Sequence, residues 1–161
     1  MIGLINYGMG NLGSVRRTFD ILNINNKIIK QPSEILDCEK IVLPGVGNFK
    51  AAMNILDKNG WSEEIKKHVE SQKPILGICL GMQLFMETGT ESGEAKGLGL
   101  LSGTSISFNS KKIDIRSPHV GWNSIEKINS NSKLLKGIHE KTDFYFVHSY
   151  FVETEKNITA A

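Results

Sequence analysis

The sequence contains few cysteines and no long hydrophobic run, and these two features argue against a disulfide-rich secreted protein and against a membrane-spanning one. Cys38 and Cys79 are the only cysteines, so no disulfide framework holds the fold, and a reducing compartment is expected. No apolar run approaches the roughly 20 residues that a membrane-spanning helix needs. The N-terminal segment also lacks the basic region and cleavage site of a secretory signal. We therefore predict a cytoplasmic protein that does not contact a membrane.

A basic stripe is missing as well. The chain has 19 Lys and Arg against 17 Asp and Glu, scattered along its length, for a net charge of +2. Nucleic-acid-binding proteins concentrate positive charge on one face, so nucleic acid is excluded as a partner. With 40% hydrophobic and 22% charged residues, the composition is that of a globular protein. The length predicts a single domain over residues 1–161.

Short apolar segments alternate with helical patterns in the first half of the chain. Strands are expected at 2–7, 27–31, 40–44 and 75–78, and helices after residue 11, at 49–59 and from Ser62 to Pro74. We expect Gly60 to cap the end of the second helix and Ser62 to be the N-cap of the third. The continuous apolar run at 75–78 is typical of a strand buried on both faces.

This alternation predicts an α/β fold with a mainly parallel central sheet flanked by helices. Beyond Gly89 the pattern changes, and further, antiparallel strands are expected in the second half. They are the segments "TSISF", "KKIDIR", "GWNSIEKI" and "FYFVHSYF".

The glycines Gly8, Gly10 and Gly13 match the spacing of a dinucleotide-binding loop. The acidic residue that would bind a ribose is missing from the end of the second strand, where Gln31 and Pro32 stand. We therefore interpret this loop as a tight turn between a strand and a helix.

The stretch "ILGICLGMQLF" places Cys79 between Gly77 and Gly81, where an apolar strand meets a helical pattern. A cysteine with this spacing is typical of a nucleophile elbow, whose sharp turn lifts the thiol above the sheet. The following helix offers unpaired N–H groups, and its dipole favours the thiolate. The alternative is a buried core thiol, which is also our interpretation of Cys38.

A thiol nucleophile needs a base, normally a histidine. His68 and His139 have charged neighbours and are expected at the surface. His119 and His148 have richer surroundings, but neither is followed by a carboxylate in an H-x-E arrangement. The base is therefore not evident from the residues.

The motif around Cys79 resembles the nucleophile motif of class I, triad-type glutamine amidotransferases, and "LPGVGNF" resembles their oxyanion loop. Together with "NYGMGNLGSV", "PHVGWN" and "YFVHSYF", in the same order and spacing, it resembles the glutaminase subunits of imidazole glycerol phosphate synthase. The resemblance runs from Met1 to about Ile158 and implies a flavodoxin-like three-layer fold. It implies no metal and no cofactor.

In that family the subunit hydrolyses L-glutamine and channels ammonia to a (β/α)₈ cyclase in histidine biosynthesis. The resemblance implies that Cys79 forms a thioester with glutamine. Backbone N–H groups would bind the oxyanion at Leu80 and in the segment Gly45, Val46 and Gly47, the latter after a peptide rearranges. The substrate-binding residues implied are Gln83, His148, Ser149 and Tyr150.

The resemblance also implies a surface that faces the synthase subunit, made by Pro118, His119, Trp122 and Asn123. Trp122 would be its aromatic anchor. A core position for this tryptophan is the alternative.

The family's catalytic His and Glu lie in an H-P-E motif that is expected beyond Ala161, so we expect the domain to be C-terminally incomplete. Three other functions stay open. They are a paralogous subunit that serves a surface-sugar amidation synthase, a catalytically silent partner-binding module, and a PfpI-like hydrolase, against which "PHVGWN" argues.

Overall fold

A computed structural model describes residues 1–111, 117–126, 132–155 and 157–161. Its first half forms a sheet with the strand order β2-β1-β3-β4. The three pairings in this sheet are all parallel, which confirms the predicted central sheet. The strands are β1 (Ile2–Ile5), β2 (Asn26–Ile29), β3 (Lys40–Gly45) and β4 (Ile75–Cys79).

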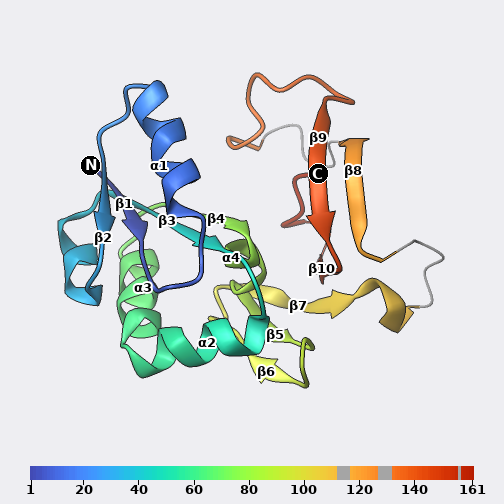
Figure 1. Ribbon diagram of the computed structural model, residues 1–161, viewed down its shortest axis with the longest axis horizontal. Helices are drawn as coiled ribbons and strands as arrows, with labels where there is room; N and C mark the ends of the chain where they lie inside the picture. The colour runs from blue at the N-terminus through green and yellow to red at the C-terminus, as the bar shows by residue number, and fades with distance from the viewer. Residues whose placement is uncertain (112–116, 127–131, 156) are drawn as a thin grey trace.

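Helices flank this sheet on both sides (Figure 1). Helix α1 (Leu12–Ile21) lies on one side, and α2 (Phe49–Lys58) and α3 (Trp61–Glu70) lie on the other. No helix in the described ranges is long and apolar enough to cross a membrane.

The junction between α2 and α3 differs in detail from the expectation. Asn59 is the C-cap of α2, and Gly60, with a φ of 80°, is the residue from which α3 begins at Trp61. Ser62 is therefore not an N-cap. It lies inside α3, and its hydroxyl donates to Asp57 Oδ1 at 2.5 Å.

A second sheet has the order β10-β7-β5-β6. Its strands are β5 (Met86–Gly89), β6 (Ala95–Lys96), β7 (Leu101–Ser107) and β10 (Tyr150–Glu153), and the short 3-10 helix η2 (Phe108–Lys111) follows β7. Strands β8 (His119–Ser124) and β9 (Asp143–His148) pair separately and antiparallel. The predicted antiparallel strands are thus confirmed in the described residues, and "FYFVHSYF" forms parts of two strands, β9 and β10. Most of "KKIDIR" and the end of "GWNSIEKI" lie outside the described residues.

Strand β4 is less buried than its apolar sequence predicts. It ends the described sheet on one side, and its residues Ile75–Cys79 are half-buried or exposed. The prediction of burial on both faces is wrong for the described residues, because no described strand covers the outer edge of β4.

The core lies between the sheet and the helices α2 and α3, with Leu43, Phe49 and Ile65 fully buried. His68 also lies in this layer. Its side chain is buried and its Nε2 lies 3.2 Å from the carbonyl oxygen of Pro74. The prediction of a solvated His68 is therefore wrong, because the ring faces inwards from α3, and burial lowers its pKa.

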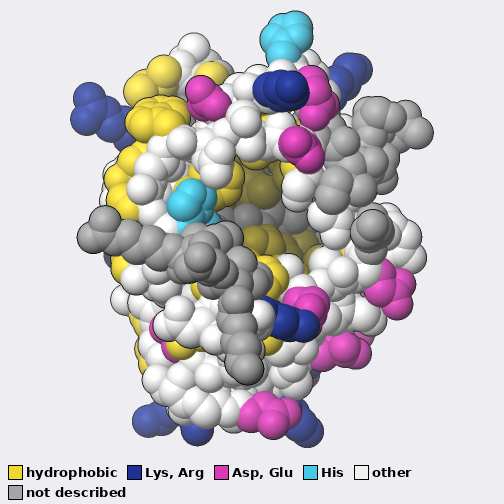
Figure 2. Space-filling view, turned by 90° about the vertical axis from the view of Figure 1, so that its right-hand side faces the viewer, with side chains coloured by type: hydrophobic (Ala, Val, Ile, Leu, Met, Phe, Trp, Pro, Cys, Tyr) yellow, Lys and Arg dark blue, Asp and Glu magenta, His cyan; other side chains and the backbone are white. Residues whose placement is uncertain are grey.

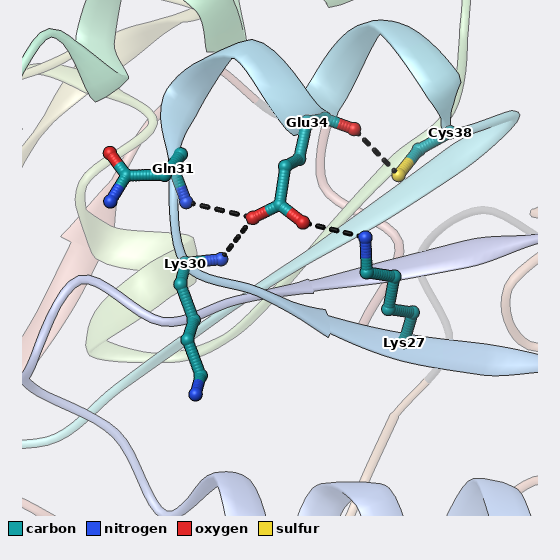
Figure 3. Close-up of polar contacts among 5 residues, drawn as sticks. All are labelled: Lys27, Lys30, Gln31, Glu34 and Cys38. Atoms are coloured by element: carbon teal, nitrogen blue, oxygen red, sulfur yellow. Dashed lines mark hydrogen bonds and ion pairs between the residues drawn. The ribbon is translucent and has the colours of Figure 1, made fainter.

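Glu34 joins the end of β2 to the 3-10 helix η1 (Pro32–Asp37) (Figure 3). Its carboxylate accepts hydrogen bonds from Lys27 Nζ at 2.6 Å and from the backbone N–H groups of Lys30 and Gln31 at 2.7 and 2.9 Å. The bond from Lys27, followed by the two backbone bonds, lowers the pKa of Glu34 to about 2. Cys38 is buried beside this cluster, as predicted, and its thiol donates to the carbonyl oxygen of Glu34.

Candidate active site

Cys79 occupies a sharp turn between β4 and the short helix α4 (Leu80–Gln83). Its backbone has a φ of 54° and a ψ of −117°, a conformation that L-residues rarely adopt and that is typical of strained functional positions. The thiol is exposed and free. Exposure excludes the core-thiol alternative, and the strained turn matches the predicted elbow.

The two glycines of the elbow are required by close approaches. A Cβ on Gly77 would lie 2.6 Å from the backbone of Met82 and 2.7 Å from the ring of Phe85. A Cβ on Gly81 would overlap the carbonyl oxygen of Leu43 in β3. The G-x-C-x-G spacing is therefore a packing requirement, since α4 folds back directly onto β3 and β4.

Helix α4 is much shorter than the pattern after Cys79 suggests. It spans Leu80–Gln83, a single turn, and β5 begins shortly after it at Met86. A helix of one turn has only a small dipole. Its main electrostatic effect on the Cys79 thiol therefore comes from the unpaired N–H groups at its start.

The predicted oxyanion segment lies beside this elbow. Gly45 is the register partner of Cys79 in the β3–β4 pairing, and a Cβ on Gly45 would lie 2.9 Å from Leu80 Cβ and 2.7 Å from the nitrogen of Gly81. Gly47 has a φ of 104°, which suits glycine. The structure thus brings Gly45 and Leu80 together with Cys79.

Val46 is oriented differently from its neighbours. Its backbone N–H donates to the carbonyl oxygen of Met9 at 3.4 Å. This N–H is engaged by the loop after β1 and does not serve an oxyanion at Cys79 in this conformation.

The loop with Gly8, Gly10 and Gly13 supports the oxyanion segment. A Cβ on Gly10 would lie 3.1 Å from Pro44 Cγ, so this glycine permits the loop to pack on β3. Asn11 caps α1 by accepting the N–H of Ser14 at 3.2 Å. These contacts agree with the interpretation of a tight turn.

The other end of the oxyanion segment is fastened by Glu91 and Ser92, which the motifs did not indicate. Glu91 Oε2 accepts the N–H of Phe49 at 2.7 Å. Asn48 caps α2 with its Oδ1, and its Nδ2 donates to Ser92 Oγ at 2.9 Å. Burial and then the charge of Glu91 raise the pKa of Tyr150.

The predicted substrate residues meet at the carbonyl oxygen of Tyr150. Gln83 is buried, and its Nε2 donates to this oxygen at 3.3 Å. His148 Nδ1 lies 2.9 Å from the same oxygen, and His148 Nε2 lies 3.1 Å from His119 Nδ1. Ser149 connects β9 to β10 and accepts the N–H of Phe108 through its carbonyl. Both ring nitrogens of His148 are therefore occupied, which leaves it unsuited to be the base for Cys79.

Tyr7 is a further residue of the site, and although it lies in the motif "NYGMGNLGSV", the motif assigned it no role. Its ring is buried, its hydroxyl has no hydrogen-bond partner among the described residues, and a Cβ on Gly45 would lie 3.0 Å from that hydroxyl. Burial and then the charge of Cys79 raise the pKa of Tyr7. A neutral hydroxyl thus lies beneath the oxyanion segment.

The β8–β9 pair has two different faces. His119 lies on the face that carries Phe146 and His148, with ring centroids 5.4 and 5.2 Å away. Trp122 lies on the opposite face and is 74% exposed, so it is not a core aromatic. That outer face also carries Val120, Tyr145 and Val147. Viewed from the right-hand side of Figure 1, the molecule is hollowed, and hydrophobic side chains are visible at the floor of the hollow (Figure 2).

Comparisons with known proteins find a matching family model and related sequences that agree with one another. The family of CobB/CobQ-like glutamine amidotransferase domains matches residues 5–137. Imidazole glycerol phosphate synthase subunit HisH 1 of Campylobacter jejuni is 45% identical over 100% of this chain and 80% of its own length. Subunit HisH of Desulfitobacterium hafniense is 45% identical over 97% of this chain and 72% of its own length.

Solved structures agree on the fold. A glutamine amidotransferase from Thermotoga maritima superposes with a TM-score of 0.65 over 95% of this chain and 62% of that chain, at 17% identity. A second glutamine amidotransferase gives a TM-score of 0.67 over 92% of this chain and 70% of that chain, also at 17% identity. These likenesses confirm the predicted fold, and the sequence relatives confirm the resemblance. The chain belongs to the HisH subunits of imidazole glycerol phosphate synthase, within the CobB/CobQ-like glutamine amidotransferases.

Proposed function

We propose that this protein is the glutaminase subunit of an imidazole glycerol phosphate synthase. It hydrolyses L-glutamine to glutamate and ammonia and passes the ammonia to a (β/α)₈ cyclase, which makes imidazole glycerol phosphate and AICAR in histidine biosynthesis. The observation that carries this proposal is the exposed thiol of Cys79 on a strained elbow beside the glycine-rich segment 45–47.

The chemistry follows from this geometry. The Cys79 thiolate attacks the carboxamide carbon of glutamine, and the negative charge moves onto the carboxamide oxygen. The N–H of Leu80, at the start of α4, donates to that oxyanion. The base that took the thiol proton returns it to the nitrogen of the tetrahedral adduct, so collapse breaks the C–N bond, releases ammonia and leaves a γ-glutamyl thioester. Water then hydrolyses the thioester to glutamate and the free thiol.

A second oxyanion donor requires a local rearrangement. The N–H of Val46 must leave the carbonyl oxygen of Met9 before it can turn towards Cys79. The bond that it leaves is long, at 3.4 Å, and Gly45 and Gly47 on either side offer the backbone freedom for such a turn.

The amino-acid part of glutamine fits the group around Gln83. A carbonyl oxygen can only accept, so the bond to Tyr150 assigns Nε2 of Gln83 to that side and turns Oε1, an acceptor, the other way. As an acceptor, Oε1 of Gln83 suits the positively charged α-amino group of an amino acid. His148, Ser149 and Tyr150 form its wall.

The base for Cys79 comes from a segment that pairs along the open edge of β4. On this strand the apolar residue Ile75 is only half-buried and Ile78 is exposed. A strand added there would cover them and would end beside Cys79, where a His and a Glu complete a triad. We infer that residues 1–161 form one amidotransferase domain together with that segment.

The outer face of β8 and β9 is the surface for the cyclase. Trp122 is the exposed aromatic anchor on this face. Pro118 directly precedes β8, and the exposed Asn123 lies on the opposite face of the strand, the face of His119. We place the protein in the cytoplasm, because a catalytic thiol must stay reduced and the cytoplasm is a reducing compartment.

The test is glutaminase activity of the full-length protein in complex with its cyclase. Cys79→Ala is expected to abolish the release of glutamate, whereas Cys38→Ala, which removes the buried thiol, is expected to retain activity if the protein folds. Equal activity of the wild type and Cys79→Ala would remove the proposal.

A further inference from the structure

A line of hydrogen bonds joins the β8–β9 pair to α4, the helix that follows Cys79, which we call the nucleophile helix. His119 Nδ1 lies 3.1 Å from His148 Nε2, and His148 Nδ1 lies 2.9 Å from the carbonyl oxygen of Tyr150. The same carbonyl oxygen accepts from Gln83 Nε2 at 3.3 Å. Because Gln83 lies on α4, one turn after Cys79, the line ends at the catalytic elbow.

The direction of each bond follows from the carbonyl at its centre. Since an oxygen of this kind only accepts, His148 must carry its proton on Nδ1. In the neutral ring Nε2 is then an acceptor, so His119 must donate from its own Nδ1. Tyr150 O receives two donors and has two lone pairs, so each bond in the line is satisfied with a single assignment of protons.

His119 is held in place by packing as well as by its hydrogen bond. Its ring stacks on Phe146 with centroids 5.4 Å apart, and His148 is in turn packed against Phe108 at 5.1 Å. The outer-face residue Trp122 points away from this group and is exposed. One strand, β8, therefore presents an exposed aromatic outwards and a hydrogen-bond donor inwards.

We propose that His119 is a positioning residue for the glutamine site, which acts through His148 and the Tyr150 carbonyl to orient the amide of Gln83. The proposal rests on the proposed function, and it adds a role for a residue that the motifs had assigned only to the partner surface. Without the donor of His119, the His148 ring is free to rotate or change tautomer, and the carbonyl that orients Gln83 loses its fixed partner.

Steady-state kinetics of the full-length protein in its cyclase complex test this role. His119→Phe keeps the stacked ring but removes the donor, and we expect the KM for glutamine to rise about fivefold with kcat within about twofold. The KM rises because Gln83 contacts the bound substrate and the transition state alike.

His119→Asn is the matched variant, because Asn Nδ2 lies where His Nδ1 lies and can donate the same bond. It is expected to restore the KM to within about twofold of the wild type. An unchanged KM in His119→Phe, or an equal rise in both variants, would overturn the proposal.

Nitrogen NMR of the histidine rings separates this proposal from the proposed function. In the wild-type protein we expect His148 protonated at Nδ1, and in His119→Phe we expect its Nε2 resonance to shift. Protonation of His148 at Nε2 in the wild type would overturn the hydrogen-bond line, whatever the activity. A wild-type complex that shows the expected resonances but does not hydrolyse glutamine would instead refute the proposed function.

Discussion

The α-carbon of Gly81 lies against the carbonyl oxygen of Leu43, so closely that a Cβ on residue 81 would overlap that oxygen. This contact packs the nucleophile helix onto β3. It ties the position of Cys79 to the central sheet through backbone atoms that cannot move independently.

Gly81→Ala is therefore expected to destabilise the protein by about 3 kcal/mol or more, and to lower glutaminase activity, because β3 and α4 must separate. Chemical denaturation measures the free energy of unfolding. Gly13→Ala is the control, since a Cβ there meets nothing closer than 4.0 Å. Its stability should stay the same or rise by less than about 1 kcal/mol.

Cys79→Gly is expected to be more stable than Cys79→Ala by about 1 kcal/mol, although neither variant is active. The reason is the φ of 54° at this residue, which glycine adopts without the strain that a Cβ brings. Thermal unfolding of the two variants side by side gives the comparison. Greater stability of Cys79→Ala would mean that the turn is not strained.

Tyr7→Phe is expected to raise stability by about 1 kcal/mol, because it removes a buried hydroxyl that has no partner among the described residues. Tyr145→Phe, at a 56% exposed residue, should change stability by less than about 0.5 kcal/mol. Denaturant titrations of both variants measure the difference. A marked loss of stability in Tyr7→Phe would show that the hydroxyl is hydrogen-bonded after all.

The lowered pKa of Glu34 predicts that the free energy of unfolding decreases in acid. Its folded pKa of about 2 lies below the ordinary value of 4.5, so the folded state favours the carboxylate. This contribution is complete above the ordinary pKa and is lost as the pH falls from about 4.5 towards about 2. Unfolding measured over this range should depend less on pH in Glu34→Gln, and an identical pH profile would contradict the assignment.

The two thiols are expected to react very differently with iodoacetamide. Cys79 is exposed, whereas Cys38 is buried and its burial raises its pKa. In the folded protein Cys79 should be alkylated first, and Cys38 only after unfolding. Mass spectrometry of digested samples identifies the modified residue, and early labelling of Cys38 would contradict the buried position.

Local patterns were sufficient for most elements of the first half and for the sharp turn at Cys79. The G-x-C-x-G spacing indicated the elbow because a sharp turn leaves no room for a Cβ at either flanking position: Gly77 lies against Met82 and Phe85, and Gly81 lies against Leu43 in β3. The alternation of strands and helices indicated the parallel sheet. The failures have a common cause. The burial of β4 and the inward position of His68 depend on what packs against them, which spacing along the chain does not contain.

The sequence by itself determined the fold class and the family, and it predicted Cys79 as the nucleophile, because these inferences use residue types and their order and spacing along the chain. Only the tertiary structure decided that Val46 donates to Met9, that Tyr7 lies beneath Gly45, and that His119 is joined to Gln83. Each of these relationships links segments that are distant along the chain. The folding of β1, β3, β8 and β10 around the elbow brings these segments into contact.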